Sequence, residues 1–151
     1  MTPNTHITVT LTSELRIEQA LKSANVTDPG TVEKLTVTGT FTGNDLAYIR
    51  QNLGKTLKEI DMSSALMTKI EVNAFEDCTA LSSITIPDSV TEIGDRAFAD
   101  CTGLTSVAIP ASVTAIGVIA FRNCPAMITV HPDNPVYKSE NGKLKEKYAR
   151  K

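Results

Sequence analysis

The sequence predicts a solenoid of stacked coils, built mainly from short strands and closed by a helical cap at its N-terminal end. Residues 75–97 and 98–120 align without a gap and are identical at 14 of 23 positions. Apolar residues upstream recur with a looser spacing of 24 and 25 residues. One such unit cannot enclose a hydrophobic interior, whereas stacked units share one.

The composition agrees with a single folded domain. The chain has 151 residues, of which 41% are hydrophobic and 21% charged. Its formal net charge of −2 offers no basic face for a nucleic acid. The sequence has no apolar stretch of the roughly 18 residues that a membrane helix needs. We therefore expect neither a nucleic-acid partner nor membrane insertion, while cytoplasmic and exported locations both stay open.

Residues 1–31 are predicted to form the N-terminal cap. Alternating apolar residues predict a strand over 7–11, and residues 13–24 predict a helix. The apolar face of this helix would consist of Ile17, Ala20, Leu21 and Ala24. Such a cap would cover core and strand edges that the end of the stack otherwise exposes.

Residues 32–132 are predicted to form about five coils. The pattern L-x-x-I-x-M at Leu57 precedes the clear repeats, and a similar pattern begins at Val32. Between these two strands, residues 44–53 predict a helix with Leu46, Ile49 and Leu53 on one face. The early coil would thus carry a helix, whereas the later coils would carry only short extended segments.

The repeat unit reads A-F-x-x-C-x-x-L-x-x-I/V-x-I-P-x-S-V-T-x-I-G. Its apolar positions predict a strand that Pro110 ends, then a second short inward-facing element, and a turn at Gly117. A third copy starts at Phe121 and, in a 23-residue frame, places Met127 at the leucine position and keeps Cys124 and Val130.

This wording resembles the bacterial leucine-rich repeats called BspA-like, over about residues 57–132 and, with looser spacing, from residue 32 onward. Residues 133–151 are similar to a closing segment of that family, with Asn134-Pro135, Tyr137 and Asn141-Gly142 at matching places. The resemblance implies a leucine-rich-repeat solenoid. It also implies an exported or surface-exposed, non-enzymatic bacterial protein used in adhesion or host contact.

Cys78, Cys101 and Cys124 recur every 23 residues. A zinc site would require closely spaced pairs, and a disulfide would require converging Cβ atoms, whereas side chains on successive coils point in parallel. We interpret the three residues as buried, reduced structural thiols, with a metal site or an intermolecular bridge as the alternatives. The motifs indicate no catalytic residue, cofactor site or metal site.

The outward side chains of the strands form a candidate binding face. One predicted column runs through Lys34, Glu59, Ser83, Ser106 and Thr129, and its neighbour through Thr36, Asp61, Thr85, Ala108 and His131. These mostly small and hydroxylated residues could hold a protein strand or a glycan. The alternative is that they are simply polar residues compatible with strands.

Val118 and Ile119 form a second candidate contact, because their counterparts one coil earlier are Asp95 and Arg96. We expect the tail, with Tyr137, Leu144 and Tyr148, to fold over this pair. The alternative is that the pair contacts another molecule.

We therefore predict a monomeric, non-catalytic binding module without a cofactor. Its expected partner is a protein or glycan on a host or neighbouring cell surface, and its expected location is extracellular or at the cell surface. The alternative is a structural spacer or stalk fragment of a larger surface protein.

Overall fold

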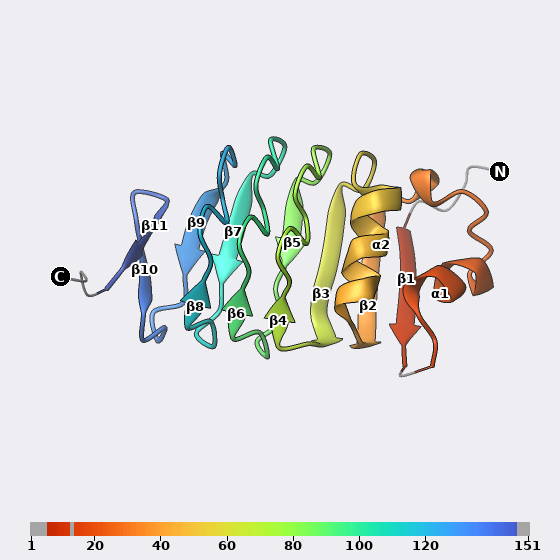
Figure 1. Cartoon of the computed structure of the whole chain (residues 1–151), viewed down its shortest axis with the longest axis horizontal. Helices are drawn as coiled ribbons and strands as arrows, with labels where there is room; N and C mark the ends of the chain where they lie inside the picture. The colour runs from red at the N-terminus through yellow and green to blue at the C-terminus, as the bar shows by residue number, and fades with distance from the viewer. Residues whose placement is uncertain (1–5, 13, 148–151) are drawn as a thin grey trace.

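Six parallel strands, one from each successive coil, form the main sheet of the computed structural model, which describes residues 6–12 and 14–147 (Figure 1). They follow one another in chain order: β1 (His6–Leu11), β2 (Lys34–Thr40), β3 (Glu59–Leu66), β5 (Ser83–Thr85), β7 (Ser106–Ile109) and β9 (Met127–Val130). Neighbouring strands that are parallel and consecutive define a solenoid, so the predicted architecture is confirmed.

A second parallel sheet runs along the stack and contains β4 (Lys69–Ile70), β6 (Glu92–Ile93) and β8 (Ala115–Ile116). These strands are the second inward-facing element of each repeat. Ile70 and Ile93 are fully buried, and Ile116 is half-buried because it lies in the last coil. Each repeat thus contributes one strand to each of two sheets, with the apolar core between them.

The aromatic position of the repeat forms a ladder. Phe75 and Phe98 stack with ring centroids 5.5 Å apart, and Phe98 and Phe121 with centroids 5.3 Å apart. Main-chain hydrogen bonds also join these coils. Phe75 N–H donates to Ala97 O at 2.7 Å, and Phe98 N–H donates to Ala120 O at 2.8 Å. The repeat therefore carries both the packing and the hydrogen bonds of the joint between coils.

Some of the serines and threonines that recur in the repeat form hydrogen bonds between coils. Thr105 Oγ1 donates to Ser82 O at 3.0 Å, and Ser82 Oγ donates to Lys58 O at the same distance. Ser89 and Ser112 likewise bond to main-chain oxygens of the preceding coil. These hydroxyls link neighbouring coils, and each donates its hydrogen to a main-chain oxygen of the chain itself.

Coils approach so closely at the turn after the second strand that only glycine fits there. A Cβ atom at Gly94 would lie 2.6 Å from Val72 N, and one at Gly117 would lie 2.4 Å from Asp95 N. This close approach, rather than a positive φ, explains the glycine that ends the repeat wording.

The first helix is shorter than predicted. It spans α1 (Ile17–Ser23), whereas residue 13, where the prediction placed its start, lies outside the described residues. Thr12 Oγ1 accepts hydrogen bonds from Leu15 N and Glu14 N, and this turn occupies the chain where the first helical turn was expected. Ile17, Ala20 and Leu21 are buried as predicted, but Ala24 is an exposed C-cap residue.

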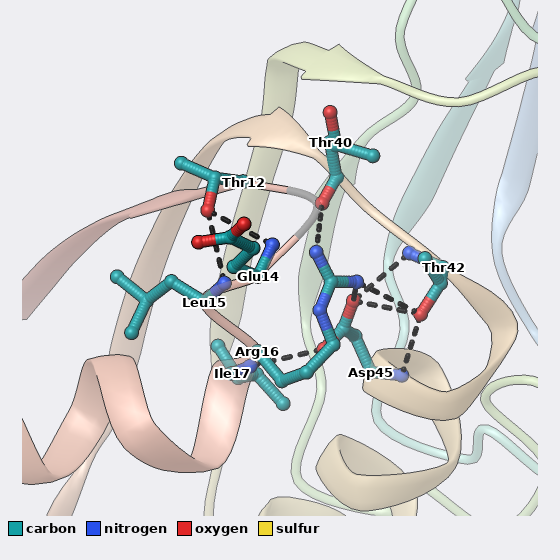
Figure 2. A network of polar contacts seen from close by, with 8 residues as sticks. All are labelled: Thr12, Glu14, Leu15, Arg16, Ile17, Thr40, Thr42 and Asp45. Atoms are coloured by element: carbon teal, nitrogen blue, oxygen red, sulfur yellow. Dashed lines mark hydrogen bonds and ion pairs between the residues drawn. The ribbon is translucent and has the colours of Figure 1, made fainter.

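A buried carboxylate attaches α1 to α2 (Gly43–Leu53) (Figure 2). Asp45, which is 1% exposed, accepts from Arg16 Nη1 at 2.7 Å and from the first helical N–H of α1, Ile17 N, at 2.9 Å. It also accepts from Thr42 in the capping box of α2. One side chain thus bonds to the N-terminal ends of two helices. Between α1 and β2 the chain forms a 3₁₀ turn, η1 (Pro29–Thr31).

Neither α1 nor α2, the α-helices of the described residues, is long and apolar enough to span a membrane.

The third copy does not keep the 23-residue frame, and this corrects the predicted columns. In the sheet, Met127 pairs with Ser106 and Ile128 pairs with Val107, a spacing of 21 residues. Met127 is therefore 61% exposed and does not occupy the inward leucine position. The reason is that the chain between Cys124 and β9 is two residues shorter than the segment between Cys101 and β7.

The closing segment ends the stack with a hairpin, β10 (Tyr137–Glu140) and β11 (Lys143–Glu146) (Figure 1). Asn141 and Gly142 have φ angles of 55° and 76°, which suits the two-residue turn between the strands. Tyr137 Oη accepts from Ile116 N at the open edge of β8, and Gly142 O accepts from Ile128 N at the open edge of β9. The hairpin therefore covers both sheet edges.

Candidate binding face

The outward side chains of the main sheet form two columns, which we call the strand face. The first contains His6, Lys34, Glu59, Ser83, Ser106 and Met127, and the second contains Thr8, Thr36, Asp61, Thr85, Ala108 and Thr129. Thr129 therefore belongs to the second column and not the first, and His131 lies beyond the end of β9. His6, Thr8 and Met127 were not among the residues predicted for this face.

The N-terminal half of the strand face is charged, and its charges pair with one another. Lys34 Nζ lies 3.3 Å from Glu59 Oε2 across the sheet. Hydrogen bonds from Ser63, with a smaller contribution from nearby Lys34, lower the pKa of Asp61. His6 Nε2 lies 3.2 Å from Thr36 Oγ1. Most polar side chains in this half therefore already have a partner within the chain.

The C-terminal half of the strand face is uncharged, and most of its hydroxyls are unoccupied, although Thr129 Oγ1 donates to Val107 O at 3.5 Å. Within residues 6–12 and 14–147, the side chains of Ser83, Thr85 and Ser106 make no hydrogen bond. This contrasts with Ser82 and Thr105 in the same coils, which bond to the preceding coil. Neighbouring hydroxyls in one repeat therefore divide into structural ones and free ones.

One of these free side chains, Thr85, lines a hollow of about 500 Å³ at the C-terminal ends of β5, β7 and β9. Four predicted face residues line this strand-face hollow, namely Thr85, Ala108, Thr129 and His131. His131 Nδ1 accepts from Asp133 N at 3.1 Å, which directs the other ring nitrogen away from its own turn. His131 therefore lies near Thr129 as predicted. It follows the end of β9, however, instead of lying in the second column.

Asp88 and Pro132 also line the hollow and were missed as site residues. Asp88 follows the proline of the repeat, where the next coil has Ala111. This difference between two otherwise similar units could have indicated a site residue. Asp88 lies in the turn after the proline, however, where an aspartate is an ordinary turn residue. Asp88 supplies the hollow with a carboxylate.

The three cysteines are free and lie within the stack. Burial raises the pKa of Cys78 from 9.0 to about 11, and burial also raises the pKa of Cys101 and Cys124. Cys101 Sγ donates to Phe75 O at 3.0 Å. Cys78 and Cys101 are buried, whereas Cys124 in the last coil is half-buried, so the three thiols are not equally sheltered.

No set of three or more His, Cys, Asp or Glu side chains in the described part of the chain is arranged to hold a metal ion.

The tail does not cover Val118. Tyr137 is buried against the last coil, and Leu144 packs beside the core, but Val118 is 70% exposed and Ile119 is 40% exposed. The hairpin instead reaches Ile116 and Ile128, which lie at the sheet edges. The expectation that this part of the tail folds over the pair is therefore wrong for Val118, and Tyr148 lies outside the described residues.

Comparison with known proteins decides the family. A model described as "BspA type Leucine rich repeat region (6 copies)" matches residues 47–146. The chain belongs to this family. The resemblance inferred from the repeat wording is confirmed, and the match extends through the closing hairpin. No match to a curated protein was found.

Two solved structures are similar to this BspA-type chain. The pneumococcal vaccine antigen PcpA has a TM-score of 0.56 and 24% identity, over 78% of this chain and 27% of that one. A leucine rich cell surface protein from Faecalibacterium prausnitzii A2-165 has a TM-score of 0.54 and 27% identity, over 80% of this chain and 41% of that one. This chain therefore spans less than half the length of either structure.

Proposed function

We propose that this BspA-type chain is a non-catalytic binding module of a bacterial exported or cell-surface protein. Its strand face would recognise a protein or a glycan on a host or neighbouring cell. The likeness to a leucine rich cell surface protein supports the location. The proposal for the ligand depends on the strand face itself.

The observation that carries the proposal is the division of hydroxyls within the repeats. Ser82 and Thr105 are occupied by bonds between coils, whereas Ser83, Thr85 and Ser106 face outward without a partner among the described residues. A hydroxyl both donates and accepts, and the columns repeat at the spacing of neighbouring strands. Such a surface suits a ligand with regularly spaced polar groups, which both extended peptides and glycans provide.

The thiols are compatible with an oxidising location. An exported protein with accessible thiols would be exposed to oxidation and exchange, which proceed through the thiolate. Burial of Cys78 and Cys101, with their raised pKa values, keeps both as unreactive thiols at neutral pH. Two of the three free thiols are therefore sheltered in an oxidising location without a disulfide, whereas half-buried Cys124 is less so.

A binding screen tests the proposal. Wild-type protein is applied to arrays of host matrix proteins and glycans beside a double variant, Thr85→Arg with Ala108→Arg, which fills the strand-face hollow. We expect the double variant to lose the hit. Thr79→Arg with Thr102→Arg is the matched control, because these exposed counterparts in two successive coils lie off the strand face and add the same charge.

Three outcomes decide between the alternatives. Loss of a hit in the strand-face variant, with retention in the control, supports recognition through this face. A hit that survives both variants places recognition elsewhere on the chain. No hit for the wild type favours the structural spacer, in which the repeats only extend the reach of a larger protein.

A further inference from the structure

The turn of the closing hairpin consists of Asn141 and Gly142, and these two residues form a chemically reactive pair. The main-chain nitrogen of the residue that follows an asparagine can attack the side-chain Cγ and close a five-membered ring. Glycine leaves this nitrogen the most accessible, because it has no Cβ atom to shield it. Residues 141–142 are the one Asn-Gly pair in the sequence.

The fold leaves both reacting groups of this pair free. The Asn141 side chain is exposed, and neither its amide nor Gly142 N–H makes a hydrogen bond with any residue that the structure describes. The hairpin ladder ends with the pair Glu140 and Lys143, so Gly142 N lies outside its hydrogen bonds. The asparagine amide and the glycine nitrogen can therefore approach each other without first losing a bond within the chain.

Other asparagines of the chain lack one of these conditions. The side-chain nitrogens of Asn52 and Asn123 each donate a hydrogen bond, at 2.9 Å and 2.8 Å. Asn134 is fully buried and precedes a proline, whose nitrogen carries no hydrogen to give up. Asn25 precedes Val26, and the branched side chain of valine hinders attack by its nitrogen. The structure thus singles out Asn141 as the asparagine most open to ring closure.

The same turn joins the hairpin to the last coil. Gly142 O accepts from Ile128 N at 2.8 Å, at the open edge of β9. Gly142 also lies so close to Met127 that a Cβ atom on the glycine would be 2.6 Å from Met127 Sδ. A longer main chain at residues 141–142 would therefore disturb both the hydrogen bond and this close contact.

We propose that Asn141 is a site of spontaneous deamidation, and that the isoaspartate formed there detaches the turn from the edge of β9. Gly142 N gives up its proton to hydroxide and attacks Asn141 Cγ. The C–N bond of the side-chain amide breaks, and ammonia leaves with a proton from water. Water then opens the succinimide ring at either of its two carbonyl groups.

The two products of ring opening differ in their effect on the fold. Opening at Cγ gives an aspartate and leaves the main chain unchanged. Opening at the main-chain carbonyl gives an isoaspartate, whose Cβ atom becomes an additional atom of the main chain. The second product moves Gly142 O away from Ile128 N and uncovers the edge of β9. This modification is independent of any ligand on the strand face.

Storage of the full chain at pH 8, followed by peptide mapping with mass spectrometry, tests the reactivity of Asn141. We expect Asn141 to deamidate at least about tenfold faster than Asn52 or Asn123. Asn141→Gly, which keeps a residue suited to a positive φ, should remove most of the deamidation. Asn123→Gly is the matched control, because Asn123 has a similar φ of 54°, and this variant should deamidate as fast as the wild type.

Hydrogen exchange of the Ile128 amide tests the structural consequence. In the isoaspartate fraction, separated by chromatography, we expect this amide to exchange at least about tenfold faster than in fresh protein. The Phe98 amide, which donates to Ala120 O inside the stack, should exchange at an unchanged rate. Freshly prepared Asn141→Asp carries the new charge without the added main-chain atom, and its Ile128 amide should exchange as in the wild type.

Three results would overturn the proposal. If Asn141 deamidates no faster than Asn52 and Asn123, the turn protects the pair from ring closure. If Asn141→Gly deamidates as fast as the wild type, the reactive asparagine lies elsewhere. If isoaspartate forms and the Ile128 amide keeps its exchange rate, the hairpin accommodates the added atom and the edge of β9 stays covered.

Discussion

The two ends of the stack are closed by different chemistry. At the N-terminal end, Asp45 joins α1 to α2 through an ion pair with Arg16 and a bond to Ile17 N. At the C-terminal end, Asn134 is fully buried and neutral. Its amide nitrogen donates to Pro110 O and Val113 O, while its oxygen accepts from Val136 N and Tyr137 N.

The polar groups at a solenoid end can therefore find hydrogen-bond partners with or without buried charge. The ionic closure depends on one carboxylate, and loss of that group leaves a partly buried guanidinium uncompensated. The neutral closure uses both hydrogen-bonding ends of one amide and adds the tyrosine hydroxyl. We therefore expect substitutions to be most costly at the ionic end.

Asp45→Ala should have the largest effect on stability. It removes the cap of two helices and the partner of Arg16, and we expect a loss of about 3 kcal/mol in the free energy of unfolding. Urea denaturation followed by circular dichroism measures it. Glu18→Ala breaks the exposed pair with Lys22 and should cost less than about 0.5 kcal/mol. Similar losses in both variants would contradict the importance of the buried network.

Asn134→Asp tests the neutral end with almost no change in shape. The new oxygen would face the carbonyls of Pro110 and Val113 instead of donating to them, so we expect a loss of about 2–3 kcal/mol. Asn52→Asp is the control, because Asn52 also donates through Nδ2 but lies on the surface of α2. A small, equal effect in both variants would mean that the buried amide is not needed for closure.

The three cysteines, Cys78, Cys101 and Cys124, differ in exposure, and Cys124 lies nearest to the C-terminal end of the stack. We expect a thiol reagent at pH 8 to label half-buried Cys124 about tenfold faster than Cys101, since labelling requires exposure and ionisation. Peptide mapping by mass spectrometry gives the order. Equally fast labelling of all three thiols in the folded protein would show that the cysteines are not sheltered.

The raised thiol pKa values also give a pH dependence. Above pH 9 the thiols of the unfolded chain ionise, while Cys78 in the folded chain stays protonated up to about pH 11. The stabilising contribution is therefore complete below pH 9 and falls as the pH rises toward 11. Replacing Cys78 by alanine should flatten this part of the stability profile.

Tyr137→Phe removes the hydroxyl that accepts from Ile116 N at 2.9 Å. The ring can stay buried, but the N–H at the edge of β8 loses its partner, so we expect a loss of about 1–1.5 kcal/mol. Thermal denaturation measures this loss. Tyr48→Phe is the control, because Tyr48 is only half-buried at the other end of the molecule and should respond weakly.

Ile119→Asn should act in the opposite direction and by the smallest amount. Ile119 has a φ of 50°, in the left-handed region, and relief of this strain should stabilise the fold by about 1 kcal/mol. Arg96→Asn, at the same position one coil earlier, is the control and should change stability less because arginine is not β-branched. A clear loss of stability in Ile119→Asn would mean that the apolar contacts of Ile119 in the last coil outweigh the backbone strain.

Sequence reasoning predicted the repeats well because their period is a property of the chain itself. The buried residues of β7, Val107 and Ile109, follow from the wording of one unit, and the same positions recur in the sheet. The helix α2 also follows from its apolar face, which Leu46, Ile49 and Leu53 bury as expected.

The two-residue shift of β9 could not be seen in the apolar pattern. Side chains alternate across a strand with a period of two, so within β9 a shift of two residues leaves Val130 inward and Thr129 outward. Met127, expected at the inward leucine position that precedes the strand, does change side and is exposed. Met127 moreover resembles the leucine that the 23-residue frame requires. The error therefore moved Thr129 and His131 along the strand face without moving either to the core.

The start of α1 and the closing bonds depend on contacts distant in sequence. Asp45 caps α1 from 28 residues away, and Asn134 reaches Pro110 across 24 residues. Local propensity contains no information on such partners. The free and occupied hydroxyls of the repeat differ for the same reason, because Ser82 and Ser83 are the same residue type and only the stacking separates them.

The joint between coils has a consequence for how such a chain can change in length. Thr105 donates to the coil before it, while Ser82, its counterpart, both donates and accepts, so each unit carries both halves of the joint. Asn134 docks on Pro110 and Val113, which the preceding unit repeats as Pro87 and Val90. Duplication or deletion of a whole unit would therefore present the closing segment with the same surface, and the stack can lengthen without a redesigned end.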